Sequence, residues 1–446
     1  MRYHPGMSKA SKPRNPDHVR RTNRPSPDSA VITERLKSLV TPAVFGQLAY
    51  YRSLGMRDRI LSLPVMVAAL LLLLWRQVPS VCELARILGR EELFWTPKVA
   101  VTQQALSKRF LIFPAEVMQR VLLDLLPTLR ERWAVRRRPL PAAVGCAHTS
   151  FTRIFVVDGS TLEALFCKLK ALQDVPPGSL AGKICTVIDL ATRLPEQIWF
   201  TEAAQAHDTY FADQILAFAP AQTLWIFDRG FFDFTFFEAL IAQGVAWITR
   251  AKSNTIFTVQ HVLLQSAAVR DRIVLLGGDD QAGVRHPVRL IEVRFGTTWY
   301  RYLTSVLDPA SLPASVVADL YRRRWRIEEA FQVVKRLLNL AYLWTGSPNG
   351  VLLQVWSTWL FFAVLVDLGD AVAEELLLPF DCISLEMVFR GVYHFMQAST
   401  RGEATDLVKY LAAPENRDLG VVKRLRKKPD RVEQVSAPYL TSPTGA

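Results

Sequence analysis

The chain has few cysteines and histidines, and neither residue type occurs in a metal-binding pattern. Five cysteines and seven histidines are spread over 446 residues, with no C-x-x-C pair and no H-x-x-x-H pair. The spacing therefore indicates neither a zinc knuckle nor a disulfide framework. We expect the cysteines to be free, buried thiols in a reducing cytoplasm.

Long hydrophobic runs are also absent. Two apolar stretches stand out, at residues 63–75 and 359–366, and both are shorter than the ~20 residues that span a bilayer. The basic N-terminus is not followed directly by the apolar segment of a signal peptide. We therefore expect two buried helices and no membrane partner.

Acidic residues are too few to balance the basic ones. The chain has 41 Asp and Glu against 54 Lys and Arg, which gives a formal net charge of +13. Such an excess favours a polyanionic partner, of which nucleic acid is the commonest. Residues 1–30 are basic and lack apolar periodicity, which predicts a disordered arm, and the basic run VVKRLRKKPDR predicts a basic tail over residues 401–446.

From residue 150 onward, the pattern alternates between strands and helices. Five apolar runs are typical of strands, and two stretches with helical spacing separate the last three of them, so that the order is β-β-β-α-β-α-β. This order predicts an α/β fold. The strand candidates are residues 153–158, 183–190, 196–203, 223–228 and 245–250, and the helix candidates are residues 208–219 and 234–244. In the first helix candidate, Asp208 is placed to cap the helix, and Gly244 closes the second.

Three further regions surround this pattern. Residues 251–315 contain alternating segments separated by the turn sequences GGDDQAG and GTT, which predicts a β-rich stretch of antiparallel strands. Residues 31–135 and 340–400 are typical of helices. Within the first helical region, residues 78–90 and 101–110 predict two short helices, the second capped by Thr102. They form either a helix-turn-helix-like DNA reader or an ordinary helix pair.

Four polar residues in YRRRWRIEEAFQVVKR share one face of a predicted helix. Tyr321, Arg324, Glu328 and Lys335 have the spacing Y-x2-R-x3-E-x6-K, and these offsets lie within roughly 60° of one another around a helix. A hydroxyl, a guanidinium, a carboxylate and an ammonium group on one face suit a metal ion and nearby phosphates. Glu329 points about 100° away, so we expect it to pair with a nearby arginine.

Two aspartates each follow an apolar strand and precede a glycine. Asp158 lies in the motif DGS and Asp228 in the motif DRG. If their strands are adjacent and parallel, the two carboxylates meet at one edge of the sheet, where Glu328 could join them. The alternative is that each aspartate forms a turn or caps a helix, the role that we expect for Asp189.

Three carboxylates with few nitrogen or sulfur ligands suit Mg2+ or Mn2+ rather than zinc. Two such ions about 4 Å apart would activate a water or a 3′-hydroxyl and stabilise the leaving oxygen of a phosphodiester. We therefore predict two Mg2+ or Mn2+ ions bound by Asp158, Asp228 and Glu328. Arg324 and Lys335 would neutralise phosphates next to the scissile bond.

With these motifs, the chain resembles the DDE transposases of bacterial insertion sequences, specifically the insertion sequence 4 group. The matching motifs are DGS, DRGF and the complete Tyr-Arg-Glu-Lys signature, and the resemblance covers residues 35–400 approximately. The segments ITRAKSN (248–254) and AAQAHD (203–208) also resemble sequences that flank the motifs in this family.

The resemblance implies an RNase H-like core that is interrupted by a β-rich insertion. It also implies cut-and-paste transposition, in which the enzyme cuts the terminal inverted repeats of an element from flanking DNA and joins them to target DNA. Many members form a DNA hairpin and act as a homodimer on two paired ends. The protein would be located in the bacterial cytoplasm, with the nucleoid. The sequence leaves open whether this chain forms a hairpin.

The resemblance suggests further DNA contacts. Carried over to this chain, Tyr321, Arg324 and Lys335 would contact phosphates of the DNA ends. Family members hold a flipped base on an aromatic residue of the insertion, for which Trp299 is the candidate; a role in the core of the insertion is the alternative. Arg250 and Lys252 are candidate DNA contacts from their positions.

Two other functions stay open at this stage. One is a stand-alone nuclease, against which the basic arms and the helical N-terminal region argue. The other is a catalytically inactive DNA-binding regulator derived from a transposase. The predicted segments are a basic arm (1–30), a helical, candidate DNA end-binding domain (31–140), the first part of the catalytic core (150–250), a β-rich insertion (251–315), the helical second part of the core (316–400) and a C-terminal tail (401–446).

Overall fold

The computed structural model describes residues 30–78, 80–162, 182–277, 286–338 and 348–423. Most of the predicted N-terminal arm, and the predicted C-terminal tail beyond residue 423, lie outside these ranges. The part of the tail that is described contains the helix α15 (Leu407–Ala412) and the 3-10 helix η8 (Pro414–Leu419).

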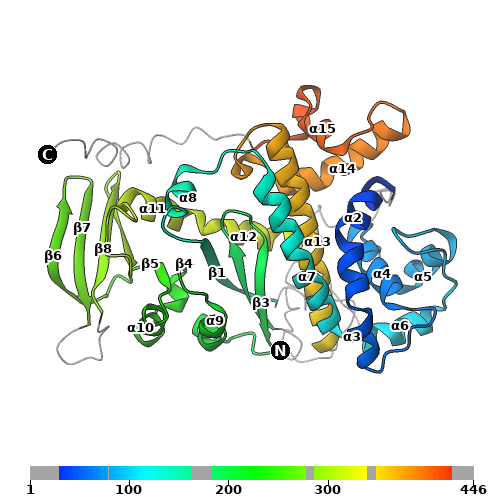
Figure 1. Cartoon of the computed structure of the whole chain (residues 1–446), viewed down its shortest axis with the longest axis horizontal. Helices are drawn as coiled ribbons and strands as arrows, with labels where there is room; N and C mark the ends of the chain where they lie inside the picture. The colour runs from blue at the N-terminus through cyan, green and yellow to red at the C-terminus, as the bar shows by residue number, and fades with distance from the viewer. Residues whose placement is uncertain (1–29, 79, 163–181, 278–285, 339–347, 424–446) are drawn as a thin grey trace, which may run out of the picture.

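The described residues form a mixed α/β structure around one nine-stranded sheet (Figure 1). The strand order is β3-β2-β1-β4-β5-β9-β8-β7-β6. Strands β1, β4 and β5 are parallel to one another, whereas β2 and β3 are antiparallel to their neighbours. The strands are β1 (Arg153–Thr161), β2 (Lys183–Asp189), β3 (Pro195–Thr201), β4 (Thr223–Phe227), β5 (Ala246–Arg250), β6 (Phe257–Gln265), β7 (Val269–Leu276), β8 (Val288–Phe295) and β9 (Thr298–Thr304).

The predicted β-rich stretch continues the core sheet. Its last strand, β9, pairs antiparallel with β5, so that Arg250 lies opposite Tyr302. Strands β8, β7 and β6 then extend the sheet on the left of Figure 1. Strand β6 lies within the predicted β-rich stretch, and most of its residues are exposed.

Helices cover both faces of the sheet, and the strands alternate between two apolar cores. In β1, Ile154 and Val156 join one core, while Phe155 and Val157 join the other, as expected for successive side chains of a strand. The helices α9 (Ala212–Phe218) and α10 (Phe234–Ala242) pack in the second core. The helices α11 (Ala314–Arg323) and α12 (Trp325–Gln332) pack in the first.

A helical domain lies beside the sheet on the right of Figure 1. Its helices are α2 (Ala30–Gly46), α3 (Leu48–Ser53), α4 (Leu63–Trp75), α5 (Val81–Arg90) and α6 (Gln103–Ile112). Ser80 caps α5 and Thr102 caps α6. However, residues 91–102 connect these two helices, and this connection is much longer than the ~3–4 residues of a helix-turn-helix turn. DNA reading by this pair therefore stays an untested prediction.

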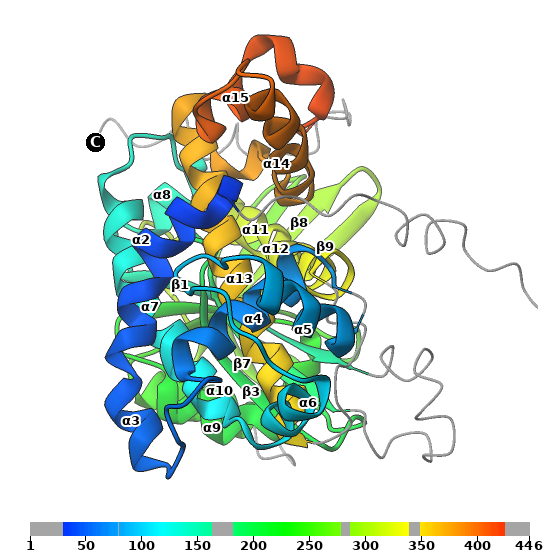
Figure 2. The same ribbon diagram turned by 90° about the vertical axis from the view of Figure 1, so that its right-hand side faces the viewer.

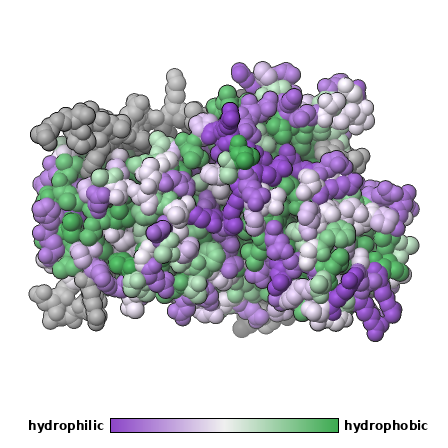
Figure 3. Space-filling view, in the orientation of Figure 1, coloured by the Kyte–Doolittle hydropathy of each residue, from purple (hydrophilic) through white to green (hydrophobic). Residues whose placement is uncertain are grey.

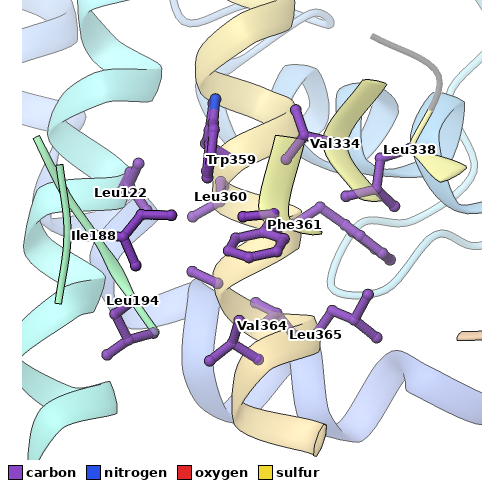
Figure 4. Packing of buried hydrophobic residues seen from close by; sticks show 14 of the residues in the cluster. Leu122, Ile188, Leu194, Val334, Leu338, Trp359, Leu360, Phe361, Val364 and Leu365 are labelled. Atoms are coloured by element: carbon purple, nitrogen blue, oxygen red, sulfur yellow. The ribbon is translucent and has the colours of Figure 1, made fainter. Parts of the chain in front are cut away.

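Both predicted apolar helices are buried. The helix α4 is buried along nearly its whole length. The other apolar run belongs to a longer helix than expected, α13 (Pro348–Glu375), which is long and apolar enough to cross a membrane. Nevertheless, 94% of its most apolar window is buried inside the protein. Figure 4 shows Trp359, Leu360 and Phe361 of α13 packed among side chains from the sheet and neighbouring helices.

Two buried aspartates connect the long apolar helix α13 to neighbouring helices through ion pairs. Asp367 and Asp370 are 3% and 1% exposed. Asp367 pairs with Arg35 of α2 and with Arg136, which follows α7 (Ala115–Val135); Asp370 pairs with Arg136 as well. Buried charges require such partners. In Figure 3, hydrophilic residues gather in the middle of the face shown, near α7 and α13.

The C-terminal part of the described chain lies on top of this assembly. The helices α14 (Leu385–Thr400) and α15 contact α13, and Figure 2 shows them stacked above the remaining helices. A short bridge joins Ile383 to Val422, so the segment after η8 returns to the base of α14.

Candidate active site at the sheet edge

The two predicted aspartates lie side by side at one edge of the sheet. β1 and β4 are parallel and adjacent, and Val157 lies opposite Phe227 in their register. Asp158 and Asp228 are the next residue of each chain segment. The expected meeting of the two strand ends is therefore confirmed, while the catalytic role of the aspartates stays a prediction.

The signature segment forms two helices and a turn of π-helix instead of one continuous helix. It begins in α11, breaks at Arg324, continues as α12 and ends in η6 (Val333–Leu337). The break directs Arg324 toward the sheet edge, where its side chain is only 8% exposed. Tyr321, Arg324 and Glu328 still meet on the same side of the segment.

One guanidinium group contacts all three predicted catalytic carboxylates. Arg324 Nη1 lies 2.9 Å from Asp158 Oδ2, and Nη2 lies 3.1 Å from Glu328 Oε1. Nε lies 3.7 Å from Asp228 Oδ1. Two strand ends and a helix therefore bring three carboxylates around one cation.

The acidic surroundings affect the proton affinity of the site. Burial is the main cause that raises the pKa of Asp158 to about 7; Arg324 opposes this shift, and the charges of Asp228, Asp208 and Glu328 add to it. Burial, more than the neighbouring charges, therefore sets the proton affinity of the Asp158 carboxylate.

Tyr321 contacts the Asp228 carboxylate, and Lys335 contacts the end of β1. The Tyr321 hydroxyl donates to Asp228 Oδ1 at 3.3 Å, and burial together with the Asp228 charge raises the pKa of Tyr321. Lys335 Nζ donates to Ser160 Oγ at 2.5 Å and to the Thr161 carbonyl at 2.8 Å. Lys335 therefore holds the DGS segment, and burial lowers its pKa.

The oxygen ligands of this site fit the predicted metal ions, but Arg324 lies between them. The carboxylate oxygens are the ligands that Mg2+ and Mn2+ prefer. Yet among the residues that the structure describes, no group of three His, Cys, Asp or Glu side chains is arranged to hold a metal ion. The guanidinium of Arg324 lies between the three carboxylates. A metal ion bound by all three requires Arg324 to move.

Glu329 has a different environment from its neighbour Glu328. It pairs with Arg326 at 2.6 Å and with Lys423 at 3.0 Å, which confirms the expectation that it pairs with an arginine. Asp189 also has a structural role, since it accepts hydrogen bonds from the backbone of Ala191 and Thr192.

Of the other predicted DNA contacts, Arg250 ends β5 at the same sheet edge, because β5 is parallel to β4 and Ile248 lies opposite Ile226, two residues before Asp228. The Trp299 ring lies under the guanidinium of Arg270, at 4.4 Å. Arg250 lies over the ring of Tyr300, and Lys252 over the ring of Phe232, at 5.1 and 5.0 Å. Their roles in DNA binding stay predictions.

The predicted role of Asp208 as a helix cap is wrong. Asp208 does not cap a helix: it is the first residue of the 3-10 helix η4 (Asp208–Phe211), in which His207 has the N-cap position. Instead it forms an ion pair with Lys183 at 2.8 Å. The only sequence signal was its place in AAQAHD, a segment noted for resemblance alone.

Comparison with known proteins identifies the domain that contains this site. Residues 149–361 match the family model of the transposase DDE domain. A relative from Sinorhizobium fredii, named as a candidate transposase, y4zB, is 26% identical over 150 residues, which are 32% of this chain and 41% of the relative. A second, from Geobacillus stearothermophilus, named as a candidate transposase for insertion sequence element IS5377, is 23% identical over 175 residues, or 38% and 45% of the two chains. The chain thus spans less than half the length of these curated relatives. Residues 149–361 of this chain are therefore similar to the DDE domain of transposases.

Proposed function

We propose that this protein is a transposase of the insertion sequence 4 group that cleaves the ends of its element and joins them to target DNA. The observation that carries the proposal is the convergence of Asp158, Asp228 and Glu328 on Arg324. The strand order β3-β2-β1-β4-β5, followed by an inserted set of antiparallel strands, supports an RNase H-like core.

The three carboxylates would hold two Mg2+ or Mn2+ ions, which supply an activated water or 3′-hydroxyl and stabilise the leaving oxygen. Asp158 and Asp228 are fixed by the sheet, and Glu328 is fixed by α12. Lys335 holds the segment after Asp158 through Ser160 and Thr161. The protein therefore contributes a rigid set of oxygen ligands, as positional catalysis requires.

Arg324 has two roles in this proposal. In the free protein it neutralises the carboxylates. When DNA binds, a phosphate near the scissile bond competes for the guanidinium, because bidentate arginine–phosphate pairs are strong. The movement of Arg324 toward phosphate then leaves the carboxylates for metal ions. Tyr321, whose hydroxyl contacts Asp228, is a second donor for phosphate at the same edge.

Double-stranded DNA is the proposed partner, as terminal inverted repeats and as target. The net charge of +13 supports a polyanionic partner. A homodimer on paired ends, a hairpin intermediate and a location with bacterial nucleoid DNA rest on the family resemblance and are proposed on that ground. An inactive regulator has no need of three carboxylates gathered at a sheet edge, so we do not favour it.

The proposal is tested by cleavage of labelled DNA that carries the repeats flanking the gene, with Mg2+. We compare the native chain with Asp228→Ala, and with Asp213→Ala as a matched control on the exposed start of α9. Cutting at the repeat boundary by the native chain and Asp213→Ala alone supports the proposal. Specific binding without cutting by any of the three would instead support the regulator, and cutting that ignores the repeats would support a simple nuclease.

A further inference from the structure

The two motif glycines beside the catalytic aspartates are both close to the side chain of Asp208. A Cβ atom on Gly159, of the DGS motif, would lie 3.2 Å from Asp208 Cγ and closer still to Oδ1. A Cβ atom on Gly230, of the DRG motif, would lie 3.1 Å from the same Cγ and closer still to Oδ2. Each oxygen of this carboxylate therefore faces one of the two glycines.

Space, and not backbone conformation, explains why both positions are glycine. Neither Gly159 nor Gly230 has a positive φ angle, so an L-residue could adopt either backbone conformation. What excludes a side chain is the Asp208 carboxylate between the two segments. Carbon and oxygen atoms cannot approach so closely unless the Asp208 side chain or one of the two segments moves.

Lys183 holds Asp208 in this position. Lys183 Nζ lies 2.8 Å from Asp208 Oδ1 and donates to the Ala206 carbonyl at 2.6 Å. Lys183 begins β2, where it lies opposite Thr161 of β1. The side chains of Lys183 and Asp208 are 10% and 19% exposed, so solvent weakens the ion pair less than it would at the surface.

The contacts of Asp208 link the two strand ends. Gly159 follows Asp158 directly, and Gly230 lies two residues after Asp228. η4, which begins at Asp208, packs against η5 (Arg229–Phe231). Any change in the Asp208 side chain therefore alters the spacing between the peptide segments that carry the two aspartates.

We propose that Asp208, anchored by Lys183, is a positioning residue that sets the separation of the Asp158 and Asp228 carboxylates. This inference rests on the proposed function, because it assigns Asp208 to the same active site. In this proposal Asp208 acts through the backbone segments that carry Asp158 and Asp228, and not through Arg324.

The packing part of the proposal is tested by a double-mutant cycle of urea unfolding on the full chain. We expect Gly230→Ala to lower the urea midpoint in the native background. In the Asp208→Ala background the same change should have little effect, because the atoms that clash with the new methyl group are gone. Gly159→Ala should keep part of its effect in that background, because a Cβ atom there would also lie 2.8 Å from Lys183 Cε. An equal loss in both backgrounds would overturn the proposal.

The positioning part is tested by single-turnover cleavage at saturating DNA, below the melting temperature of each variant. We expect Asp208→Ala to cut about 10- to 100-fold more slowly, since small displacements of catalytic groups have effects of this size. Its affinity for DNA ends should be unchanged, and it should need more Mn2+ for half-maximal cutting. Asp208→Asn, which keeps the shape of the side chain, should recover most of the rate.

Asp213→Ala is the matched control and should cut like the native chain. If Asp208→Ala also cuts at the native rate with the native Mn2+ requirement, Asp208 is structural only and the proposal is wrong. If the native chain itself does not cut, the proposed function fails. The unfolding cycle still decides, in that case, whether Asp208 fills the space between the two glycines.

Discussion

Arg324 Nη1 lies 2.9 Å from Asp158 Oδ2, although 166 residues separate the two in the sequence. The same guanidinium reaches the other two carboxylates of the site. Although burial alone would lower it, the charges of Asp158 and Asp228 raise the pKa of Arg324. Arg324 is therefore a firmly charged counter-ion at the place where the proposal puts metal ions.

This relationship predicts that Arg324→Ala makes the free protein depend on divalent ions for stability. Loss of a buried counter-ion should lower the free energy of unfolding by about 3 kcal/mol in the absence of metal. Added Mg2+ or Mn2+ should then raise the melting temperature of the variant more than that of the native chain, because the ions no longer compete with the guanidinium. Thermal melting with and without Mn2+ measures both effects.

The control for this experiment is Arg322→Ala, two residues away. The Arg322 side chain is 59% exposed and pairs with Asp319 on the same helix. Its removal should change neither stability nor the response to metal appreciably. An Arg324→Ala variant that gains no more from Mn2+ than this control would contradict the idea that Arg324 and metal ions compete.

Glu328 and Glu329 provide a second test, because they are adjacent and chemically identical. Glu328→Ala should abolish DNA cleavage and leave DNA binding largely intact, since Glu328 contributes one of the three carboxylates. Glu329→Ala should keep cleavage and lose about 1 kcal/mol of stability or less, because Glu329 pairs with Arg326 and Lys423 and is partly exposed. Strand cleavage and filter binding on the same DNA would separate the two; loss of binding in Glu328→Ala would show a structural role instead.

The main features of the site could be predicted from local sequence patterns. The apolar runs before Asp158 and Asp228 and their order along the chain predicted two strands, and the parallel pairing of these strands brings the aspartates together. Helical spacing placed Tyr321 and Glu328 on one side of a segment. These features depend on periodicity, which the sequence shows directly.

Other features depend on contacts between distant segments, and no local pattern shows them. The break of the signature segment at Arg324 coincides with its contacts to Asp158 and Asp228, which lie on other elements far away in the sequence. Asp208 looked like a helix cap because its partner, Lys183, lies 25 positions earlier on another element. Strand β6 has exposed residues on both faces, so its place in the sheet follows from its pairing with β7 and not from a buried face.

The lowered pKa of Asp381 predicts how the free energy of unfolding depends on pH. Although burial raises it, the charges of Arg193, Arg326 and Arg323 lower the pKa of Asp381 to about 2. An unfolded aspartate titrates near ~3.9, so the stabilisation by this group is complete above that pH and is lost as the pH falls through about 2. Asp381→Asn should therefore lose about 2 kcal/mol at neutral pH and less at strongly acidic pH.

Urea unfolding of the native chain and Asp381→Asn from neutral pH down to the lowest pH at which both are folded measures this difference. Asp213→Asn, an exposed residue of α9, is the control and should match the native chain throughout. The difference in the free energy of unfolding between the native chain and Asp381→Asn could instead stay constant on acidification. That result would contradict a pKa of Asp381 that its three arginines lower.

Lys252 provides the last test, which concerns DNA binding apart from catalysis. Its side chain is exposed, and its ammonium group lies 5.0 Å from the ring of Phe232, four residues after Asp228. If Lys252 contacts a phosphate, Lys252→Ala should weaken DNA binding and reduce the slope of log affinity against log salt concentration by about 0.9. Fluorescence anisotropy over a series of salt concentrations measures that slope. Lys409→Ala, which changes an exposed lysine on α15, should leave it unchanged. Equal slopes for the two variants would remove Lys252 from the DNA-binding surface and place the phosphate contacts nearer to Tyr321 and Lys335.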